Sequence, residues 1–256
     1  MPTPTLVNDG SKTTNISKTI AEQLDMSIDT INSQALNDNT TAPLWTPLVN
    51  SDNTALKPIA GFSAAFKRLE DFVLGSIALA ILFPLMAIIS IVIKLDSTGP
   101  ALFCQARNGR NGEIIKVYKF RTMFQNHSSE FKQAQRNDPR ITRIGNFLRK
   151  TSLDELPQLF NVIQGSMSMV GPRPHPLQLD ADFQYVIPAL SSRYCVKPGI
   201  TGWAQINGYR GETRRVSDMV ARIEHDRFYI RNWTVFMDIK ILLLTVVKGW
   251  THKNAY

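Results

Sequence analysis

Residues 72–93 have the sequence FVLGSIALAILFPLMAIISIVI, a run of 22 residues without a charged side chain. At about 1.5 Å per residue, a straight helix of this length would be roughly 33 Å long, which is enough to cross a bilayer. Pro84 lies at its centre, where it removes a helix hydrogen bond and bends the axis. Basic residues flank both ends, Lys67 and Arg68 before the run and Lys94, Arg107 and Arg110 after it. A single span fits the length, whereas a re-entrant helix with both ends on one membrane face also fits the proline and the charges.

The segment before this run, residues 1–60, is poor in core-forming side chains. Asn, Thr, Ser, Asp and Pro make up 32 of its 60 residues, and Trp45 is its only aromatic residue. This composition predicts a disordered N-terminal tail. The tail does not combine a basic start with an apolar core, so it is not expected to be a signal peptide.

Charge is distributed unevenly along the chain. Residues 1–71 hold five basic and eight acidic side chains, a net charge of −3. Since the whole chain carries +8, residues 72–256 carry +11. A basic body of this kind favours an anionic partner, such as nucleic acid, lipid headgroups or a phosphorylated substrate.

Cysteine and histidine are too few and too scattered to define a disulfide framework or a zinc site. The two cysteines, Cys104 and Cys195, are far apart, which is compatible with a reducing compartment. The four histidines show no zinc-ligand spacing. Oxygen ligands are therefore expected for any metal ion.

Shorter segments complete a mixed α/β pattern. KVYKFRTM, residues 116–123, alternates as a strand does, and residues 137–150 contain a turn followed by a basic amphipathic segment. The apolar stretch near the C-terminus is interrupted by Asp238 and Lys240, and its uninterrupted part, 241–247, is too short to span a membrane. A helix lying in the membrane interface, with Lys240 and Lys248 at headgroup level, is expected there.

An acid pair, Asp154 and Glu155, lies within TSLDELPQLF, residues 151–160. Ser152 and Glu155 have the spacing of a capping box, and a helix start would explain both acids without any chemistry. Pro157 fits poorly inside such a helix. The pair also suits catalysis, and from these residues alone both interpretations stay open.

Cations and rigid turns cluster in the same half of the chain. Lys119 and Arg121 are two residues apart and would share a face in a strand, while Arg149 precedes the acid pair. Arg173 lies between two prolines in GPRP, which would hold its guanidinium in place for a phosphate group. The glycine-rich stretch KPGITGWAQINGYRGET, residues 197–213, adds further tight turns. Each signal is weak by itself and each has a structural explanation.

Together these features favour a phosphorylated, membrane-held substrate over nucleic acid, since no nucleic-acid module is recognisable. An ionised acid pair facing a diphosphate would require fixed cations and a divalent cation such as Mg²⁺. Adjacent carboxylates cannot flank a glycosidic bond from both sides, so a glycosidase pair is excluded. A non-enzymatic scaffold bound to acidic lipid remains the alternative.

The chain resembles the bacterial sugar transferases, the monotopic polyprenyl-phosphate phosphoglycosyl transferases. The resemblance covers about residues 67–256. It is carried by the Lys-x-Arg motif at 119–121, DPRITRIGNFLRKTSLDELPQLFNVIQGSMSMVGPRP at 138–174, and the glycine-rich stretch at 197–213. Many relatives have an N-terminal module of four membrane helices and a soluble domain, which is not expected in this sequence.

The resemblance implies a function. Such enzymes transfer a sugar-1-phosphate from a UDP-sugar to undecaprenyl phosphate, release UMP, require Mg²⁺, and start exopolysaccharide, capsule or O-antigen assembly. The resemblance assigns Asp154 as the nucleophile of a covalent phosphosugar intermediate and the pair Asp154–Glu155 as catalytic and metal-binding. It matches Arg149 and Arg173 to family positions, and Lys119 and Arg121 join them as expected phosphate ligands.

The resulting expectation is an α/β, mostly α, monotopic membrane protein. Residues 1–60 form the tail and 61–256 the transferase domain, with a re-entrant helix at 72–93 broken at Pro84, interfacial amphipathic helices and a small catalytic domain. We expect it at the bacterial inner membrane, facing the cytoplasm, with acidic lipid as a partner and a homo-oligomer left open. The C-terminal residues favour UDP-glucose, with UDP-galactose or another UDP-sugar as alternatives.

Overall fold

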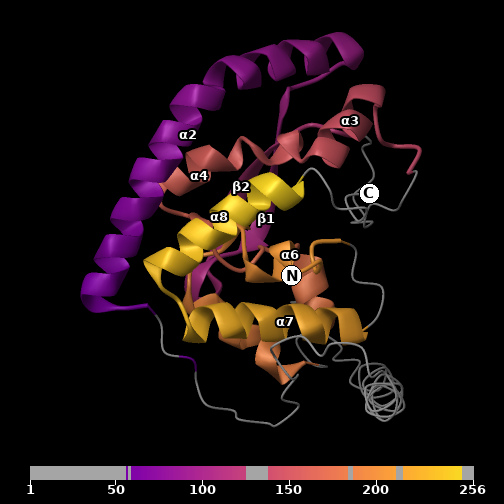
Figure 1. Cartoon of the computed structure of the whole chain (residues 1–256). Coiled ribbons are helices and arrows are strands. Elements are labelled where there is room, and N and C mark those ends of the chain that lie inside the picture. The colour runs from indigo at the N-terminus through magenta and orange to yellow at the C-terminus, as the bar shows by residue number, and fades with distance from the viewer. Residues whose placement is uncertain (1–55, 57–58, 125–137, 184–186, 212–215, 250–256) are drawn as a thin grey trace, which may run out of the picture.

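The computed structural model describes residues 56, 59–124, 138–183, 187–211 and 216–249. The expected disordered tail, apart from residues 56, 59 and 60, lies outside the described residues. The described part is mostly helical, as expected, and contains two small sheets (Figure 1).

The longest element is α2, Gly61–Asp96, an apolar helix of 36 residues. It is the one helix in the described part long and apolar enough to cross a membrane, by length and composition. Pro84 does not break it, because hydrogen-bonded helix continues on both sides of the proline. Figure 1 shows instead that its axis changes direction toward its C-terminal end. The structure thus replaces the expected break with a bent continuous helix, and it does not test whether the helix is re-entrant.

One face of α2 packs on the domain and the rest is exposed and apolar. Gly75 lies so close to α4, Gln158–Gln164, that a Cβ added there would come within 3.1 Å of Val162. Arg68 donates to the carbonyls of Val162 and Ile163, both at 2.6 Å, which satisfies the last turn of α4. The exposed face carries large apolar side chains along the whole helix, among them Phe62, Phe66, Leu69, Phe72, Ile77, Ile81, Phe83, Ile88, Ile91 and Leu95.

A two-stranded antiparallel hairpin follows α2. Its strands are β1, Leu102–Asn108, and β2, Ile114–Phe120, and the turn η1, Arg110–Gly112, joins them. The predicted strand at 116–123 is confirmed as far as Phe120. A second, parallel pair joins β3, Ser168–Val170, to β4, Gly199–Thr201. At its end the backbones approach so closely that a Cβ on Gly199 would lie 2.1 Å from the Gly171 nitrogen, so glycine is required there.

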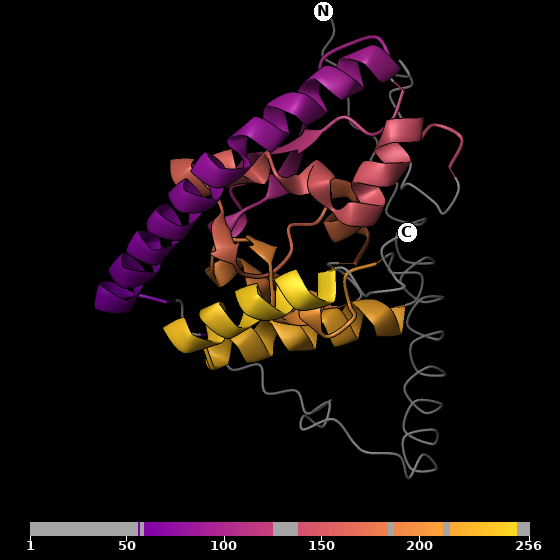
Figure 2. The same ribbon diagram turned by 45° about the horizontal axis from the view of Figure 1, so that its top comes forward.

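The remaining helices complete the described part, and α8 packs on both strands of the second sheet. They are α3, Arg143–Thr151; η2, Leu153–Glu155; α5, Leu177–Phe183; η3, Pro188–Cys195; α6, Trp203–Ile206; α7, Val216–Arg231; and α8, Val235–Gly249. In Figure 2 α8 lies in front of α7, and Tyr229 and Ile230 of α7 share a core with Ile241 of α8. The outer face of α8 exposes Phe236, Ile239, Leu243, Val246 and Val247.

A buried ionic cluster fixes α2 to α8. The Lys67 Nζ lies 2.9 Å from Asp71 Oδ1 and 2.8 Å from Asp238 Oδ2. Asp238 is fully buried and also accepts hydrogen bonds from the Tyr229 hydroxyl and the Trp233 indole, both at 2.9 Å. Lys67, a basic flank of the apolar run, therefore pairs with Asp238, which interrupts the apolar stretch near the C-terminus.

Replacing Asp238 with Asn should lower the free energy of unfolding by about 2 kcal/mol, because Lys67 loses one of its two counter-charges in a buried site. The amide keeps the size and an acceptor oxygen. Thermal unfolding of the purified chain in detergent measures the loss. Glu113→Gln, the same change at an exposed acid, should stay within about 0.5 kcal/mol of wild type. Equal stability of the two variants would show that the cluster does not hold the helices together.

Candidate active site

The acid pair lies on η2, between the end of α3 and the start of α4. Ser152 has a left-handed backbone, with φ of 62°, and its N–H donates to the Arg149 carbonyl, so Ser152 ends α3. Its hydroxyl makes no capping bond, and α4 starts only after Pro157. The capping-box prediction is therefore wrong, because the chain turns at Ser152 before the next helix can form. The misfit of Pro157 disappears, since it occupies the N-cap position of α4.

Glu155 is the centre of the site, 6% exposed and surrounded by three cations. Arg173 holds both of its carboxylate oxygens, Nη1 to Oε2 at 2.9 Å and Nη2 to Oε1 at 2.5 Å. The Lys119 Nζ lies 3.0 Å from Oε1, and the Arg210 Nη2 lies 3.4 Å from Oε2. Burial raises the pKa of Glu155, but Arg173 and Lys119 outweigh it and hold that pKa well below its usual range. Glu155 is thus a fixed anion.

Three separate segments supply these cations. Lys119 is at the end of β2, Arg173 follows β3 in the Gly171–Pro174 loop, and Arg210 follows α6. The structure thus brings together Lys119 and Arg173 of the predicted phosphate ligands. Arg210 was not predicted, although it lies in the glycine-rich stretch that the sequence singled out.

Asp154 differs from its neighbour. It is partly exposed, and no hydrogen bond to its carboxylate is found within the described segments. Burial, followed by repulsion from Glu155, raises the pKa of Asp154 to about 6, while Lys119, Arg173 and Arg149 oppose the rise. N–H groups at a helix start would have lowered this pKa, because they favour the charged form, so the shift is opposite to the one that a capped helix would cause. The carboxylate is therefore open to an external partner.

The two other predicted phosphate ligands, Arg149 and Arg121, make no hydrogen bond or ion pair with Glu155 in the part of the chain that the structure describes. Arg149, in the last turn of α3, lies close enough to Asp154 to lower its pKa. Arg121 is not in the site. It lies just beyond β2 and donates to the carbonyls of Ser97, at 2.7 Å, and Thr98, where it caps the end of α2. The prediction that Lys119 and Arg121 share one face of a strand is wrong, because β2 ends at Phe120, before Arg121.

A layer of buried side chains behind the site holds the two arginine-bearing loops. Arg193 donates to the Arg173 carbonyl at 2.5 Å and pairs with Asp226 at 2.8 Å. Arg222 donates to the carbonyls of Tyr209, at 2.9 Å, and Gly211, at 2.5 Å, which flank Arg210. Both loops are therefore fixed from the interior.

His175 lies between these two arginines. Its ring nitrogens lie 2.6 and 2.9 Å from the Arg193 Nη1, and Nε2 lies 3.3 Å from the Arg222 Nη1. Burial and then Arg193 lower the pKa of His175 to about 3, so the ring is neutral and can accept. The Nδ1 of the ring also lies 2.9 Å from Asp180 Oδ1. None of these buried residues was among the predicted site residues.

Metal binding at the pair is supported more by Asp154 than by Glu155. The described part contains no group of three or more His, Cys, Asp or Glu that could hold a metal ion. Both oxygens of Glu155 are engaged by cations, so a metal ion there would have to displace a guanidinium. Asp154 can offer one carboxylate, which is enough for Mg²⁺ when substrate phosphates and water complete its coordination.

Comparison with known proteins places the chain in a family. Residues 62–252 match the model of the bacterial sugar transferase family. UDP-glucose:undecaprenyl-phosphate glucose-1-phosphate transferase of Escherichia coli K12 is 50% identical over 200 residues, which are 78% of this chain and 43% of that protein. The chain thus spans less than half the length of that relative.

Two further relatives differ in length and in name. The Rhizobium leguminosarum exopolysaccharide production protein PSS is 44% identical over 195 residues, 74% of this chain and 98% of that protein. The Aeromonas hydrophila UDP-N-acetylgalactosamine-undecaprenyl-phosphate N-acetylgalactosaminephosphotransferase is 41% identical over 187 residues, 72% of this chain and 43% of that protein. The chain therefore belongs to the bacterial sugar transferase family, and its sequence is of the type found in undecaprenyl-phosphate glucose phosphotransferases.

Proposed function

We propose that the protein is a phosphoglycosyl transferase, which moves a hexose-1-phosphate from a UDP-sugar to undecaprenyl phosphate. The observation that supports this best is the asymmetry of the acid pair. Glu155 is anchored among Lys119, Arg173 and Arg210, whereas the neighbouring Asp154 carboxylate is open. An open carboxylate beside fixed cations is the arrangement that a nucleophile attacking a diphosphate requires.

In the first step a carboxylate oxygen of Asp154 attacks the phosphorus that carries the sugar. The bond from this phosphorus to the bridging oxygen breaks, and UMP leaves with that oxygen. The product is an aspartyl phosphosugar, a mixed anhydride of Asp154. In the second step a phosphate oxygen of undecaprenyl phosphate attacks the same phosphorus, which restores the Asp154 carboxylate and forms the lipid diphosphate sugar.

The surrounding cations offset the charge of the donor. A UDP-sugar brings two phosphate charges toward two carboxylates, so the site needs several positive groups in a low-dielectric environment. Arg173 and Arg210, held in their loops by Arg193 and Arg222, provide fixed guanidinium groups. We propose Mg²⁺ as the cofactor, which when bound would neutralise charge on the diphosphate and orient its oxygens.

Membrane attachment follows from the exposed apolar surfaces of α2 and α8. Water-exposed patches of this extent are rare in soluble monomers and mark membrane or protein contacts. We propose that α2 is re-entrant, that α8 lies in the interface, and that the site faces the cytoplasm at the inner membrane. Undecaprenyl phosphate would then reach the site from the bilayer.

A non-enzymatic scaffold on acidic lipid is the second candidate, and the position of the cations does not favour it. Such a scaffold needs cations on its surface, at the level of the headgroups. Here Lys119 and Arg173 are turned inward to a buried glutamate, with side chains 19% and 21% exposed. Burying ionic groups has a desolvation cost, and a scaffold that binds headgroups at its surface does not require it.

For the donor we propose UDP-glucose, because the Escherichia coli relative is named for it. The Aeromonas hydrophila relative is named for UDP-N-acetylgalactosamine, which makes this donor an alternative to test. The pathway class is the start of a lipid-linked exopolysaccharide, capsule or O-antigen.

A UMP-release assay with undecaprenyl phosphate, Mg²⁺ and a panel of UDP-sugars tests the proposal. Turnover is expected with UDP-glucose, and slower turnover with UDP-galactose and UDP-N-acetylgalactosamine. If another donor reacts and UDP-glucose does not, the sugar assignment is wrong and the transfer reaction stands. If the folded protein releases no UMP from any donor, the scaffold is the better explanation.

A further inference from the structure

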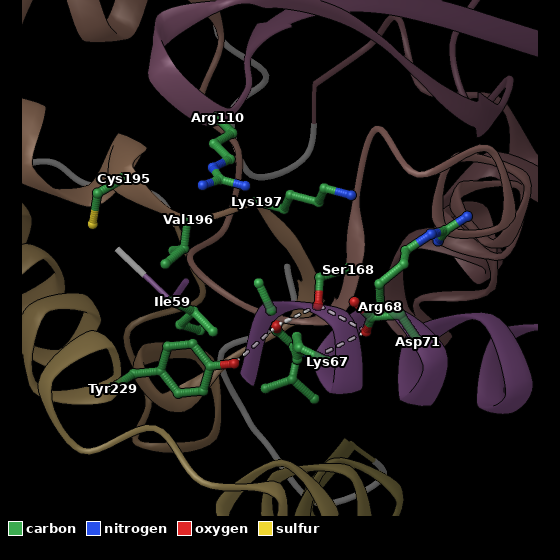
Figure 3. Close-up of a pocket in the computed structure, with 12 residues that line it drawn as sticks. Ile59, Lys67, Arg68, Asp71, Arg110, Ser168, Cys195, Val196, Lys197 and Tyr229 are labelled. Carbon is green, nitrogen blue, oxygen red and sulfur yellow. Dashed lines mark hydrogen bonds and ion pairs between the residues drawn. The ribbon is translucent and has the colours of Figure 1, made fainter. Parts of the chain in front are cut away.

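A pocket of about 80 Å³ lies on the side of the domain beside the first turns of α2 (Figure 3). It is bounded by the N-terminal part of α2, the tip of the β1–β2 hairpin, and the segment from Cys195 to Lys197 that leads into β4. It is distinct from the acid pair. Arg110 enters it from the hairpin tip, before β2 begins, whereas Lys119 reaches Glu155 from the other end of β2, five residues or about 17 Å beyond Ile114.

One part of the lining is already neutralised. Lys67 and Asp71 form an ion pair at 2.9 Å, and Asp71 also accepts from the Ser168 hydroxyl at 2.8 Å. The Arg68 guanidinium is hydrogen-bonded to two carbonyls but carries no counter-charge from them. Because Lys67 also pairs with Asp238 at 2.8 Å, the two cations Lys67 and Arg68 are balanced by the two carboxylates. The uncompensated positive charge of the pocket comes from Arg110 and Lys197.

Two further cations, Arg110 and Lys197, line the other part of the pocket. Within the described segments, neither the Arg110 guanidinium nor the Lys197 ammonium has a hydrogen bond or an ion pair, and the Arg110 Nε is buried. Figure 3 shows Arg110 reaching into the pocket next to Val196 and Lys197. Burial, then Arg68, lowers the pKa of Lys197, with Arg110 adding to the effect and Asp71 opposing it. Three like charges thus face one small space.

The hairpin tip is shaped to hold Arg110 there. Asn111 and Gly112 both have left-handed backbones, with φ of 56° and 77°, and the Gly109 N–H closes the turn on the Glu113 carbonyl at 2.7 Å. A left-handed non-glycine residue costs energy. The tight turn that results directs Arg110 into the pocket instead of leaving it in solvent.

We propose that this pocket binds a phosphate group through Arg110 and Lys197, with Arg68 adding positive charge. Guanidinium and ammonium donors around a small cavity match the oxygens of a phosphate. The volume of about 80 Å³ suits a single phosphate group. The group can belong to a membrane lipid or be free in solution. The lipid is favoured, since Phe62 and Phe66 of the same helical turns are exposed, at 84% and 44%, and would lie in the bilayer surface.

The test uses the purified full chain in neutral detergent and follows its thermal unfolding midpoint against ligand concentration. The probes are dioctanoyl phosphatidylglycerol, dioctanoylglycerol, which lacks the phosphate, and inorganic phosphate. The midpoint should rise with the phospholipid and not with dioctanoylglycerol. In Arg110→Gln/Lys197→Gln the apparent affinity should fall about tenfold or more, as expected for loss of charged hydrogen bonds.

Two controls separate this pocket from general charge and from the acid pair. Lys94→Gln/Lys116→Gln removes the same charge at two exposed positions and should bind the phospholipid as wild type does. Arg173→Gln should also bind normally, since the pocket does not include the acid pair. If the double variant fails to fold, Lys197→Gln alone serves, because its side chain has no bond to lose within the described part.

A midpoint that rises with inorganic phosphate, and depends on Arg110 and Lys197, would identify a free phosphate as the ligand. Dependence on the phospholipid alone would identify a lipid headgroup. Equal affinity of wild type and variant, or loss of binding in Arg173→Gln, would overturn the proposal. No donor sugar is present, so the result is independent of the sugar-transfer reaction.

Discussion

Replacing Asp154 with Asn is expected to abolish transfer of the sugar-1-phosphate while the chain stays folded. An amide cannot form the aspartyl phosphosugar, and the surrounding cations cannot replace a covalent step. We expect turnover to fall by at least about 10³-fold, as for other lost nucleophiles. The structure offers no capping bond that the change could break, so stability should change by less than about 1 kcal/mol. UMP release and thermal unfolding measure the two effects.

The same change should remove a covalent intermediate that wild type accumulates. Incubation with a UDP-sugar radiolabelled in the sugar, Mg²⁺ and no lipid acceptor should leave label on wild-type protein, and peptide mapping should place it within residues 151–160. Asp154→Asn should carry none, and Glu113→Gln, an exposed acid on the β1–β2 turn, should behave as wild type. Label on another residue, or an active Asp154→Asn enzyme, would remove Asp154 from the nucleophile role.

The fold was predictable where a local pattern determines it. The uncharged run 72–93 lies within the long apolar helix α2, and the alternation at 116–120 is a strand. The bend at Pro84 was predictable, but the continuity of the helix was not, because packing against α4 and the hairpin supports the helix on both sides of the proline. The left-handed backbone of Ser152, which prevents the predicted capping box from forming, was not predictable either.

The site was predictable where a residue type itself restricts the backbone or the chemistry. Arg173 between two prolines and Lys119 in a strand do meet at Glu155. The residues behind the site were missed because their role depends on which loops become neighbours. Arg193 and Arg222 contact the backbone of distant segments through carbonyls, and no sequence spacing records such contacts.

Removing the charge of Glu155 should impair the enzyme and also change its pH dependence. In Glu155→Gln, Lys119, Arg173 and Arg210 lose their common anion, so we expect kcat/KM to fall about 10²- to 10³-fold, as for other broken buried ion pairs. Glu155→Asp keeps the charge on a shorter side chain. It should therefore lose less activity than Glu155→Gln if the negative charge at this position matters more than the length of the side chain.

The pH dependence distinguishes an electrostatic role of Glu155 from a purely structural one. Asp154 must be ionised to attack, and repulsion from Glu155 helps raise its pKa to about 6, so wild-type kcat/KM should fall as the pH drops through that region. Without this repulsion the pKa of Asp154 falls, and the acid limb of Glu155→Gln should move to lower pH. Arg173 lowers the pKa of Asp154, so Arg173→Gln should move the limb to higher pH. Profiles measured at one Mg²⁺ concentration test both signs, and limbs that stay in place or move together would contradict an ionised Asp154 controlled by these two neighbours.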